Sequence, residues 1–505
     1  MRSRALILIF VLGASITDAT VNAKESVLRH PNPERPLQER WEWAQNESKN
    51  YRTGYWIGYS IEKLMGRHSY TGSFHEGWKD KPSLSEIIYG IKVNDEEDLL
   101  SDAEIIRRSA RRALDDLEGR DQPEEKVLKQ VAILFRFPRS GGFDRVRFNN
   151  MSLHVDLEGL PVIWLDKAQD RESVALLTDL YQYAADDDAK EKIVAAVGIH
   201  TPSDPVLSFL ENVLDSREHD DIREKAAFWL GQQDNTKALK ILLRAAEEDR
   251  SSDVREQAVF AISQLDIKEA TDALITLAND AEDYGVREKA VFWLGQGNDP
   301  RALTALLHIV NTDPSDDVRE KAVFAISQMK NEKAAAALID LAYNGKYQNV
   351  REKAVFWLGQ RSDSQGLEAL LKIANTDPSM DVREQAVFGI SQMRSDEATE
   401  ALIDLAYNAG SYEVRKKSVF WLGQKATKKA ASALENVVYD DEDLDIQKQA
   451  VFALSQLPKD DGIPKLIKIC KTHPSSEIRK KAIFWLGQTD DRRAVDALVE
   501  IVRKQ

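Results

Sequence analysis

Cysteine is almost absent from this chain of 505 residues, and positive charge is in deficit. The single Cys470 excludes an intramolecular disulfide and any cysteine-rich metal site. A total of 69 lysines and arginines against 84 aspartates and glutamates gives a net charge of −15. This balance argues against a nucleic-acid partner, because cationic side chains must neutralise phosphates. With 43% hydrophobic and 30% charged residues, the composition is typical of a folded, soluble protein.

Long apolar runs are also missing, except at the start of the chain. Arg2 and Arg4 precede an apolar stretch, residues 5–14, that is too short to span a bilayer. Val21-Asn22-Ala23 follows as a cleavage site. Residues 1–23 therefore predict a signal peptide, and we expect a periplasmic or secreted protein without stable membrane insertion after cleavage near Ala23. A retained N-terminal anchor is the alternative.

Internal repetition dominates the rest of the sequence. A motif close to VREKAVFWLGQ returns every 32 residues without insertion. Its arginine recurs, with one glutamine substitution, at Arg223, Arg255, Arg287, Arg319, Arg351, Arg383, Arg415, Gln447 and Arg479. Each unit is expected to hold two helices, for example 301–310, started by Asp299 and Pro300, and about 318–329. Two such short helices cannot bury their apolar faces alone, so the units must stack.

This motif resembles the HEAT-repeat family, in particular its short bacterial form of the PBS-lyase type, in which Val318-Arg319 is a typical opening of the second helix. The resemblance covers residues 161–505. It implies an all-α, right-handed α-solenoid. Val162–Lys167 and Lys190–Gly198 echo the motif as degenerate units, which brings the total to about eleven repeats.

A second period of 64 residues lies on the first. One motif position carries Trp229, Trp293, Trp357, Trp421 and Trp485 in alternate repeats, which we call tryptophan repeats. The intervening small-residue repeats carry Ala261, Ala325, Gly389 and Ala453 there. Large residues beside small ones are what close packing of neighbouring helices requires, so the tryptophans are interpreted as mainly structural and the building block as a pair of repeats.

The outward side of the second helix carries an unusual invariance within the chain. On a helical wheel, Val318, Ala322, Ile326 and Met329 form the core stripe, whereas Phe324 and Gln328 fall on the far side. Every matched repeat keeps both outer residues, which we call the Phe/Gln ladder. Its members are Phe228, Phe260, Phe292, Phe324, Phe356, Phe388, Phe420, Phe452, Phe484, Gln232, Gln264, Gln296, Gln328, Gln360, Gln392, Gln424, Gln456 and Gln488.

Because second helices line the concave side of HEAT solenoids, the resemblance places this ladder along an inner groove. Exposed aromatic rows usually mark binding surfaces, and a glutamine amide can pair with one peptide group. An extended peptide or a glycan would suit such a row. The competing interpretation is packing, with the phenylalanines half-buried over neighbouring helices or both residues preserved by recent duplication. The arginine row, with acids such as Asp317 nearby, is expected to be a structural ion ladder between repeats.

Residues 24–160 do not follow the period and predict a small α/β cap for the solenoid. Aromatic residues are dense over 41–78, and 102–117 reads as an arginine-rich helix. Strands are expected at 127–137, 144–149 and 152–156, with a turn at Ser140-Gly141-Gly142. A solenoid needs a cap for its terminal apolar face, and that role alone accounts for the aromatic residues.

Catalytic motifs are scarce. Some HEAT-like proteins are di-iron hydroxylases with repeated His-Glu pairs, but only His75-Glu76 has that form here. His68, His75 and Glu76 match no defined metal spacing, and the chain has no glycine-rich phosphate loop or nucleophile elbow. The prediction is therefore a non-enzymatic exported scaffold without a cofactor, which binds a protein or extended peptide along the ladder. The alternatives are a cell-envelope glycan-binding protein and an enzyme with its site in the N-terminal module.

Overall fold

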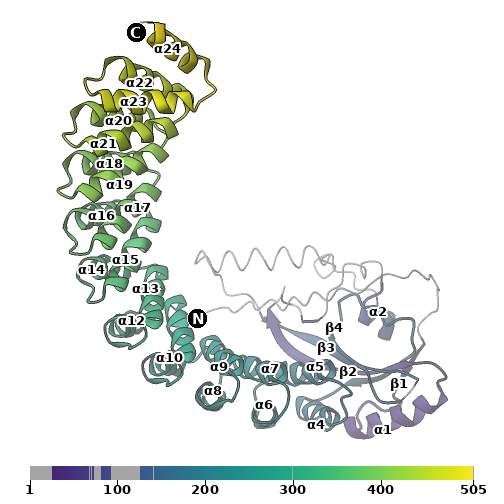
Figure 1. Cartoon of the computed structure of the whole chain (residues 1–505). Helices are drawn as coiled ribbons and strands as arrows, with labels where there is room; N and C mark the ends of the chain where they lie inside the picture. Colours follow the sequence, from purple (N-terminus) through teal and green to yellow (C-terminus); the bar gives the residue numbers. More distant parts are fainter. Residues whose placement is uncertain are drawn as a thin grey trace. The chain divides into compact units, whose positions relative to one another are not determined.

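The computed structural model describes residues 26–66, 69, 71–72, 81–91, 126–139, 141–297 and 299–503. These residues form one five-stranded sheet and 23 α-helices, and the chain divides into two compact units, 1–273 and 274–505 (Figure 1). The predicted signal peptide, the predicted helix at 102–117, and His68, His75 and Glu76 lie outside the described residues. No helix in the described part of the chain is both long enough and apolar enough to cross a membrane.

The first unit opens with a mixed sheet of strand order β1-β5-β2-β3-β4. Its two parallel pairs join β1 to β5 and β5 to β2, and the two antiparallel pairs join β2 to β3 and β3 to β4. The long strands are rich in β-branched and aromatic residues, which suit a pleated surface. The elements of this module are β1 (Val27–Arg29), α1 (Leu37–Glu47), the 3-10 helix η1 (Ser48–Asn50), β2 (Tyr55–Gly66), α2 (Leu84–Tyr89), β3 (Lys126–Phe137), β4 (Arg145–Asn150) and β5 (Val162–Lys167).

Helices cover both faces of the sheet (Figure 1). On one face, Trp41 of α1 packs edge-on against Phe135 of β3, with ring centroids 5.3 Å apart. On the other face, α2 and the loop after β4 close a core around Trp56, Leu134 and Trp164. Trp41, Trp56 and Trp164 therefore pack the core of the sheet, and the role of the module as a cap for the solenoid stays a prediction.

Two local predictions in this module are wrong. Val162–Lys167 is not a worn helical repeat but strand β5, buried between β1 and β2. A short continuous apolar run has the same pattern in a buried strand and in a helix, so periodicity could not separate them. Residues 152–156 form no strand, and only an isolated bridge joins Ser83 to His154. The predicted domain boundary at residue 160 itself stays a prediction.

Paired helices follow the sheet module. Within the first unit these are α4 (Asp170–Tyr181), α5 (Asp187–Gly198), α6 (Asp204–Leu214), α7 (Asp220–Leu230), α8 (Thr236–Glu248) and α9 (Ser252–Gln264). The unit boundary falls inside α10 (Lys268–Asp280). The degenerate unit predicted at 190–198 is confirmed as helical, because it forms most of α5.

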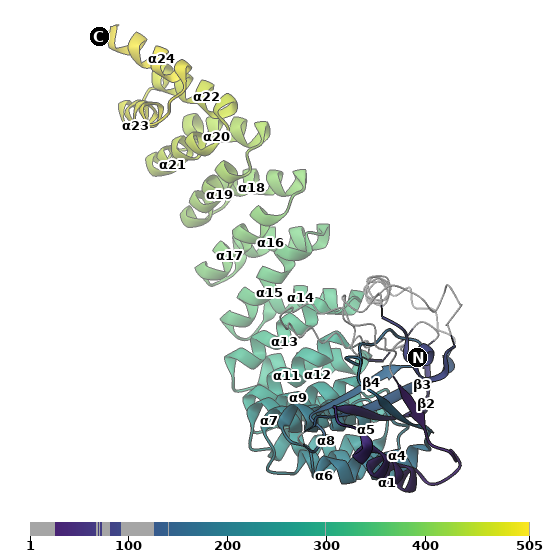
Figure 2. The same ribbon diagram turned by 90° about the vertical axis from the view of Figure 1, so that its right-hand side faces the viewer.

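The second unit continues the pattern in two layers, with first helices on one side and second helices on the other (Figure 2). Its helices are α11 (Tyr284–Gln296), α12 (Pro300–Thr312), α13 (Asp316–Gln328), α14 (Glu332–Asn344), α15 (Gln348–Arg361), α16 (Ser364–Thr376), α17 (Met380–Gln392), α18 (Asp396–Asn408), α19 (Tyr412–Gln424), α20 (Lys428–Asp440), α21 (Leu444–Gln456), α22 (Lys459–Thr472), α23 (Ser476–Gly487) and α24 (Arg492–Arg503). The described residues thus hold ten helix pairs followed by the single helix α24, because the first predicted unit is a strand.

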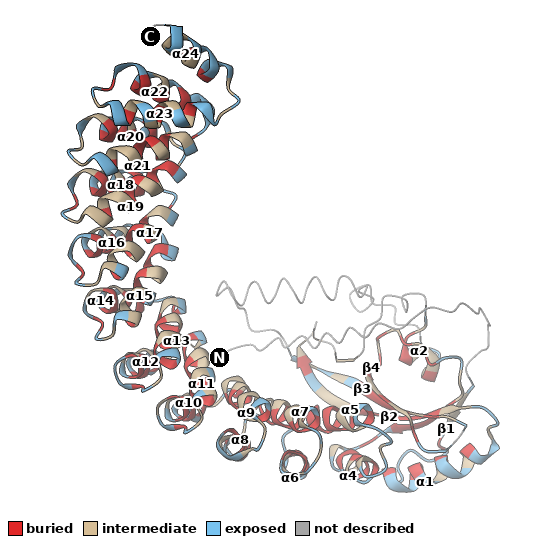
Figure 3. Cartoon of the chain, viewed as in Figure 1, coloured by how far each residue is buried: buried red, intermediate tan, exposed pale blue. Residues whose placement is uncertain are grey.

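Caps and the apolar stripe explain why each unit folds this way. The Asp299 carboxylate accepts a hydrogen bond from the Arg301 backbone N–H at 2.9 Å and starts α12, as predicted. Ser315, rather than an aspartate, is the N-cap of α13. The predicted stripe of Val318, Ala322, Ile326 and Met329 is 0–5% exposed. Figure 3 shows buried residues of this kind in both helix layers of the repeats.

Candidate binding surface on the second helices

The phenylalanines of the Phe/Gln ladder are neither buried nor free. Eight of them are half-buried, and the last one, Phe484, is 52% exposed. In two of the pairs of repeats the rings stack. Phe292 and Phe324 lie 6.3 Å apart between centroids at 12°, and Phe228 and Phe260 lie 6.4 Å apart at 21°. The stacked rings therefore pack on one another and still present apolar surface to solvent.

The glutamines are the more exposed half of the ladder. Gln232 and Gln264 are half-buried, and the other seven are exposed. In the small-residue repeats each amide nitrogen donates to the preceding serine hydroxyl at 3.1 Å, and that hydroxyl donates to the phenylalanine carbonyl at 2.6 Å. These Gln–Ser–Phe chains are Gln264-Ser263-Phe260, Gln328-Ser327-Phe324, Gln392-Ser391-Phe388 and Gln456-Ser455-Phe452. The amide orientation is thus fixed through its nitrogen, and the amide oxygen is left as the acceptor.

The tryptophans extend the phenylalanines into a wider surface. Trp357 meets Phe356 of its own helix edge-on, with centroids 5.0 Å apart, and meets Phe324 of the preceding repeat at 5.1 Å. The same inter-repeat contact joins Phe388 to Trp421 and Phe452 to Trp485. Trp229 is buried, but the other four tryptophans are half-buried. We call the seven ladder phenylalanines of the second unit, from Phe292 to Phe484, together with Trp293, Trp357, Trp421 and Trp485, the aromatic row.

The tryptophans were interpreted from sequence as structural, and packing is indeed part of their role. Their partial exposure adds apolar surface beside the ladder phenylalanines. The sequence signal for this surface was the 64-residue period itself, because it places each tryptophan directly after a ladder phenylalanine.

Two kinds of junction alternate between second helices. Inside a pair, a Cβ added to Gly295 would lie 2.6 Å from the Ala325 Cβ, and one added to Gly359 would lie 2.7 Å from the Gly389 Cα. Such distances leave no space for a side chain. Between pairs, the Phe–Trp contacts fill the junction instead. The structure therefore supports the pair of repeats as the building block.

The arginine row supports the same pairing. Arg287 reaches Asp313 of the next repeat at 2.9 Å, and Arg351 reaches Asp377 at 3.0 Å. The predicted ion ladder between repeats is therefore present, but its acid is Asp313 and not Asp317, which is exposed. The sequence placed Asp317 next to the arginine of its own helix, whereas the bridge crosses to the loop of the following repeat.

All motif arginines except Arg223 also close their own repeat, because the guanidinium donates to the backbone carbonyl six residues before it. The Arg287 guanidinium donates to the Ala281 carbonyl at 2.8 Å, at the end of the preceding first helix, and Arg351 donates to Gly345 at 3.0 Å. Gln447 keeps this bond, because its amide nitrogen donates to the Asp441 carbonyl at 2.6 Å. Gln447 therefore lacks the charge of the arginine that it replaces but keeps the hydrogen bond to the carbonyl six residues before it.

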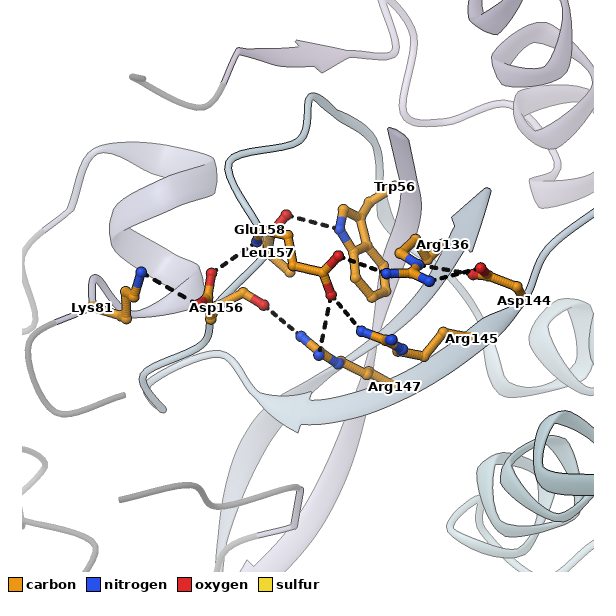
Figure 4. A network of polar contacts seen from close by, with 9 residues as sticks. All are labelled: Trp56, Lys81, Arg136, Asp144, Arg145, Arg147, Asp156, Leu157 and Glu158. Atoms are coloured by element: carbon orange, nitrogen blue, oxygen red, sulfur yellow. Dashed lines mark hydrogen bonds and ion pairs between the residues drawn. The ribbon is translucent and has the colours of Figure 1, made fainter. Parts of the chain in front are cut away.

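A second polar cluster lies in the sheet module (Figure 4). Glu158 has a left-handed backbone, φ 61°, and its carboxylate pairs with Arg136 at 2.6 Å and with Arg145. Arg147 lies 3.8 Å from the same carboxylate, and its guanidinium stacks over Trp56 at 5.1 Å. Burial, reinforced by the neighbouring Arg145, lowers the pKa of Arg147 to about 10. This cluster fastens the loop before β5 to β3 and β4.

Metal and thiol chemistry receive no support from the described part of the chain. No group of three or more His, Cys, Asp or Glu in this part could hold a metal ion. Cys470 is buried on α22, where its thiol donates to the Ile467 carbonyl at 3.1 Å and burial raises its pKa.

Stacked helix pairs with a repeated outer face define an α-solenoid. Family comparison is more specific. The HEAT repeats profile matches residues 207–291, 271–359 and 344–410, and the PBS lyase HEAT-like repeat profile matches 478–504. The chain is a HEAT-repeat family protein.

Solved structures with a similar fold are distant. Escherichia coli YibA is 19% identical over 55% of this chain and 100% of its own, with a TM-score of 0.30. Human deoxyhypusine hydroxylase in complex with glycerol is 18% identical over 61% of this chain and 97% of its own, with a TM-score of 0.22. Kap95p, solved with RanGDP, is 15% identical over 65% of this chain and 50% of its own, with a TM-score of 0.36. No curated protein matches the chain.

Proposed function

We propose that this HEAT-repeat protein is an exported, non-enzymatic scaffold that binds a protein partner, as an extended peptide segment, along the aromatic row. Export is inferred from residues 1–23. The observation that supports binding is the partial exposure of a ring on every second helix of the second unit, on the same helix face. Contiguous apolar surface is costly to keep in water, at about 25 cal/mol per Å², and usually marks an interaction site.

The spacing of the two stacked rings favours an extended chain. Phe292 and Phe324 are 6.3 Å apart, close to the roughly 6.6 Å between side chains i and i+2 of an extended strand that rises about 3.3 Å per residue. The neighbouring glutamine oxygens, such as that of Gln328, can accept hydrogen bonds from peptide N–H groups. Rings and amides would thus recognise the side chains and the backbone of the same segment.

A glycan partner is less well supported. Sugars stack on open aromatic faces, but Phe324 has Phe292 on one side at 6.3 Å and Trp357 on the other at 5.1 Å. The edges of these rings are more available than their faces. Ring edges suit apolar side chains better than pyranose rings.

Selection from a random peptide library tests the proposal. The full chain should enrich peptides with alternating apolar residues. Replacement of Phe292, Phe324 and Phe356 by alanine should weaken the enriched peptides at least about tenfold, because each loses an apolar contact. Circular dichroism should show the helical content retained.

The matched control removes aromatic rings from the other helix layer. Tyr343 of α14 and Tyr407 of α18 are also half-buried, and their replacement by alanine should leave peptide affinity unchanged. Equal loss in both variants, or an unaltered affinity in the phenylalanine variant, would reject the aromatic row as the binding surface. Binding of cell-wall polysaccharide, lost in the phenylalanine variant, would favour the glycan alternative.

A further inference from the structure

The charge beside the aromatic row changes sign along the chain. The residue after each motif arginine lies four positions before the ladder phenylalanine, and therefore on the same helix face. In the first six matched repeats this residue is glutamate, and in the last three it is lysine. The series runs Glu224, Glu256, Glu288, Glu320, Glu352, Glu384, Lys416, Lys448 and Lys480.

Two glutamates in the earlier part of the second unit, Glu320 and Glu384, are neutralised within the protein. At junctions between pairs, Lys353 binds Glu320 at 3.0 Å, and Lys417 binds Glu384 at 2.8 Å. Each ion pair lies beside a Phe–Trp contact, Phe324–Trp357 or Phe388–Trp421. These two junctions are therefore balanced in charge.

The next junction between pairs breaks this rule. The positions equivalent to Glu320 and Lys353 are occupied by Lys448 and Lys481, so two lysines replace an acid and a base beside Phe452–Trp485. Lys448 pairs only with the exposed Asp445 of its own helix, at 3.3 Å, among the described residues. Lys481 lies over Phe484 and Trp485, at 5.7 and 5.6 Å from the ring centroids.

We infer that α19, α21 and α23 bind an acidic peptide segment of the protein partner, with its carboxylates at Lys416, Lys448 and Lys480 and its apolar side chains on the adjacent rings. This inference rests on the proposed function of the aromatic row and adds the charge of the segment. Exposed pairs within one helix, such as Lys448–Asp445, contribute little, so an incoming carboxylate can replace them.

An acidic peptide fits this surface better than a nucleic acid. Glu413, Asp445 and Glu477 lie in the first turns of the same three helices, three residues before the lysines. A phosphate chain carries charge at every nucleotide and would be repelled there. A peptide can place acids only opposite the lysines and neutral residues opposite the acids.

The test restores the residue that earlier repeats use. The variant Lys416→Glu, Lys448→Glu, Lys480→Glu copies the first six repeats, so the fold accommodates it. The probes are labelled peptides of about twelve residues, enough to span three repeats at about 3.3 Å per residue. They alternate leucine with glutamate or, in the neutral analogue, leucine with glutamine.

In fluorescence anisotropy, the full chain should bind the glutamate peptide at least about tenfold tighter than the glutamine peptide. Added salt should reduce this difference in affinity. The lysine variant should lose that preference. The control Glu288→Lys, Glu352→Lys alters the same position in earlier repeats and should retain the preference. Equal affinity for both peptides, an unchanged preference in the lysine variant, or tighter binding of single-stranded DNA would each overturn the inference.

A second variant separates this inference from the proposed function. Phe420→Ala, Phe452→Ala, Phe484→Ala should weaken both peptides. If the glutamate and glutamine peptides bind the parent equally, and bind the lysine variant equally, but both are lost in this phenylalanine variant, the aromatic row stands and the charge inference fails. If neither peptide binds the parent, both fail.

Discussion

One 32-residue motif forms two different junctions in this protein. Inside a pair, glycine meets alanine or glycine, and an arginine binds the aspartate of the next repeat. Between pairs, a tryptophan packs on the preceding phenylalanine, and a lysine binds a glutamate. The first junction excludes side chains and brings the helix backbones together. The second is built from side chains and is the one that displays aromatic surface.

Gly359→Val should break the within-pair junction and have the largest effect. Its Cβ would lie 2.7 Å from the Gly389 Cα, and a backbone atom cannot move aside as a side chain can. We expect a loss of about 3 kcal/mol in the free energy of unfolding, measured by urea denaturation. The matched control is Gly487→Val, because nothing lies within 4 Å of a Cβ at that site. Equal unfolding midpoints in the two variants would contradict the close-contact interpretation.

Trp357→Ala should weaken the between-pair junction by a smaller amount. The ring is half-buried and contacts Phe324 and Phe356, so we expect about 2 kcal/mol, below the range for fully buried tryptophans. Trp357→Phe should recover part of this loss. If the alanine variant unfolds like the parent protein, the tryptophan is not a packing residue. Its recurrence every 64 residues would then be explained by binding alone.

A chain of buried polar side chains joins the sheet to the first helix pair. The His200 ring lies 2.8 Å from the Ser173 hydroxyl, which lies 2.8 Å from the Tyr59 hydroxyl. Burial, together with nearby Lys63, lowers the His200 pKa, although Asp170 opposes this. The unfolded chain then takes up the proton first, so stability should fall as pH drops below about 6.5. His200→Gln should flatten this pH dependence in thermal unfolding, and an unchanged slope would exclude His200 as its source.

Gln447→Arg should have the smallest effect. It restores the arginine row, but the existing glutamine already donates to the Asp441 carbonyl. In another repeat Arg319 pairs with Asp316, three residues before it. The equivalent residue before position 447 is Leu444, so the new guanidinium would have no such carboxylate to pair with. We expect a gain of about 0.5 kcal/mol or less. A gain comparable to the loss in Trp357→Ala would mean that the charge, and not the hydrogen bond, is the main contribution of this row.

Periodicity predicts correctly those residues whose surroundings are the same in every repeat. The core stripe at Val318 and Ala322 could be predicted because eight other registers show the same pattern. The partner of Arg287 could not, because the bridge depends on how consecutive repeats stack and not on spacing within one. The strand at Val162–Lys167 failed for a related reason: it has no repeated counterpart, and its neighbours β1 and β2 are distant in sequence.

The Phe/Gln ladder was likewise predicted only in part. The wheel placed Phe324 and Gln328 away from the core, and the structure leaves them half-buried and exposed. The wheel treats one helix alone, so it could not show that Phe292 and Trp357 cover part of the Phe324 ring. The exposure of each ring to solvent depends on the rings that pack against it, and these belong to adjacent repeats.

The alternation of junctions limits how such an array can lengthen. Insertion of a single 32-residue unit would bring two tryptophan repeats, or two small-residue repeats, side by side and would lose one of the two complementary contacts. Insertion of 64 residues would keep both. Arrays of this type should therefore grow and shrink by duplication or deletion of whole pairs, and an engineered length variant should be cut between Phe324 and Trp357 rather than between Gly359 and Gly389.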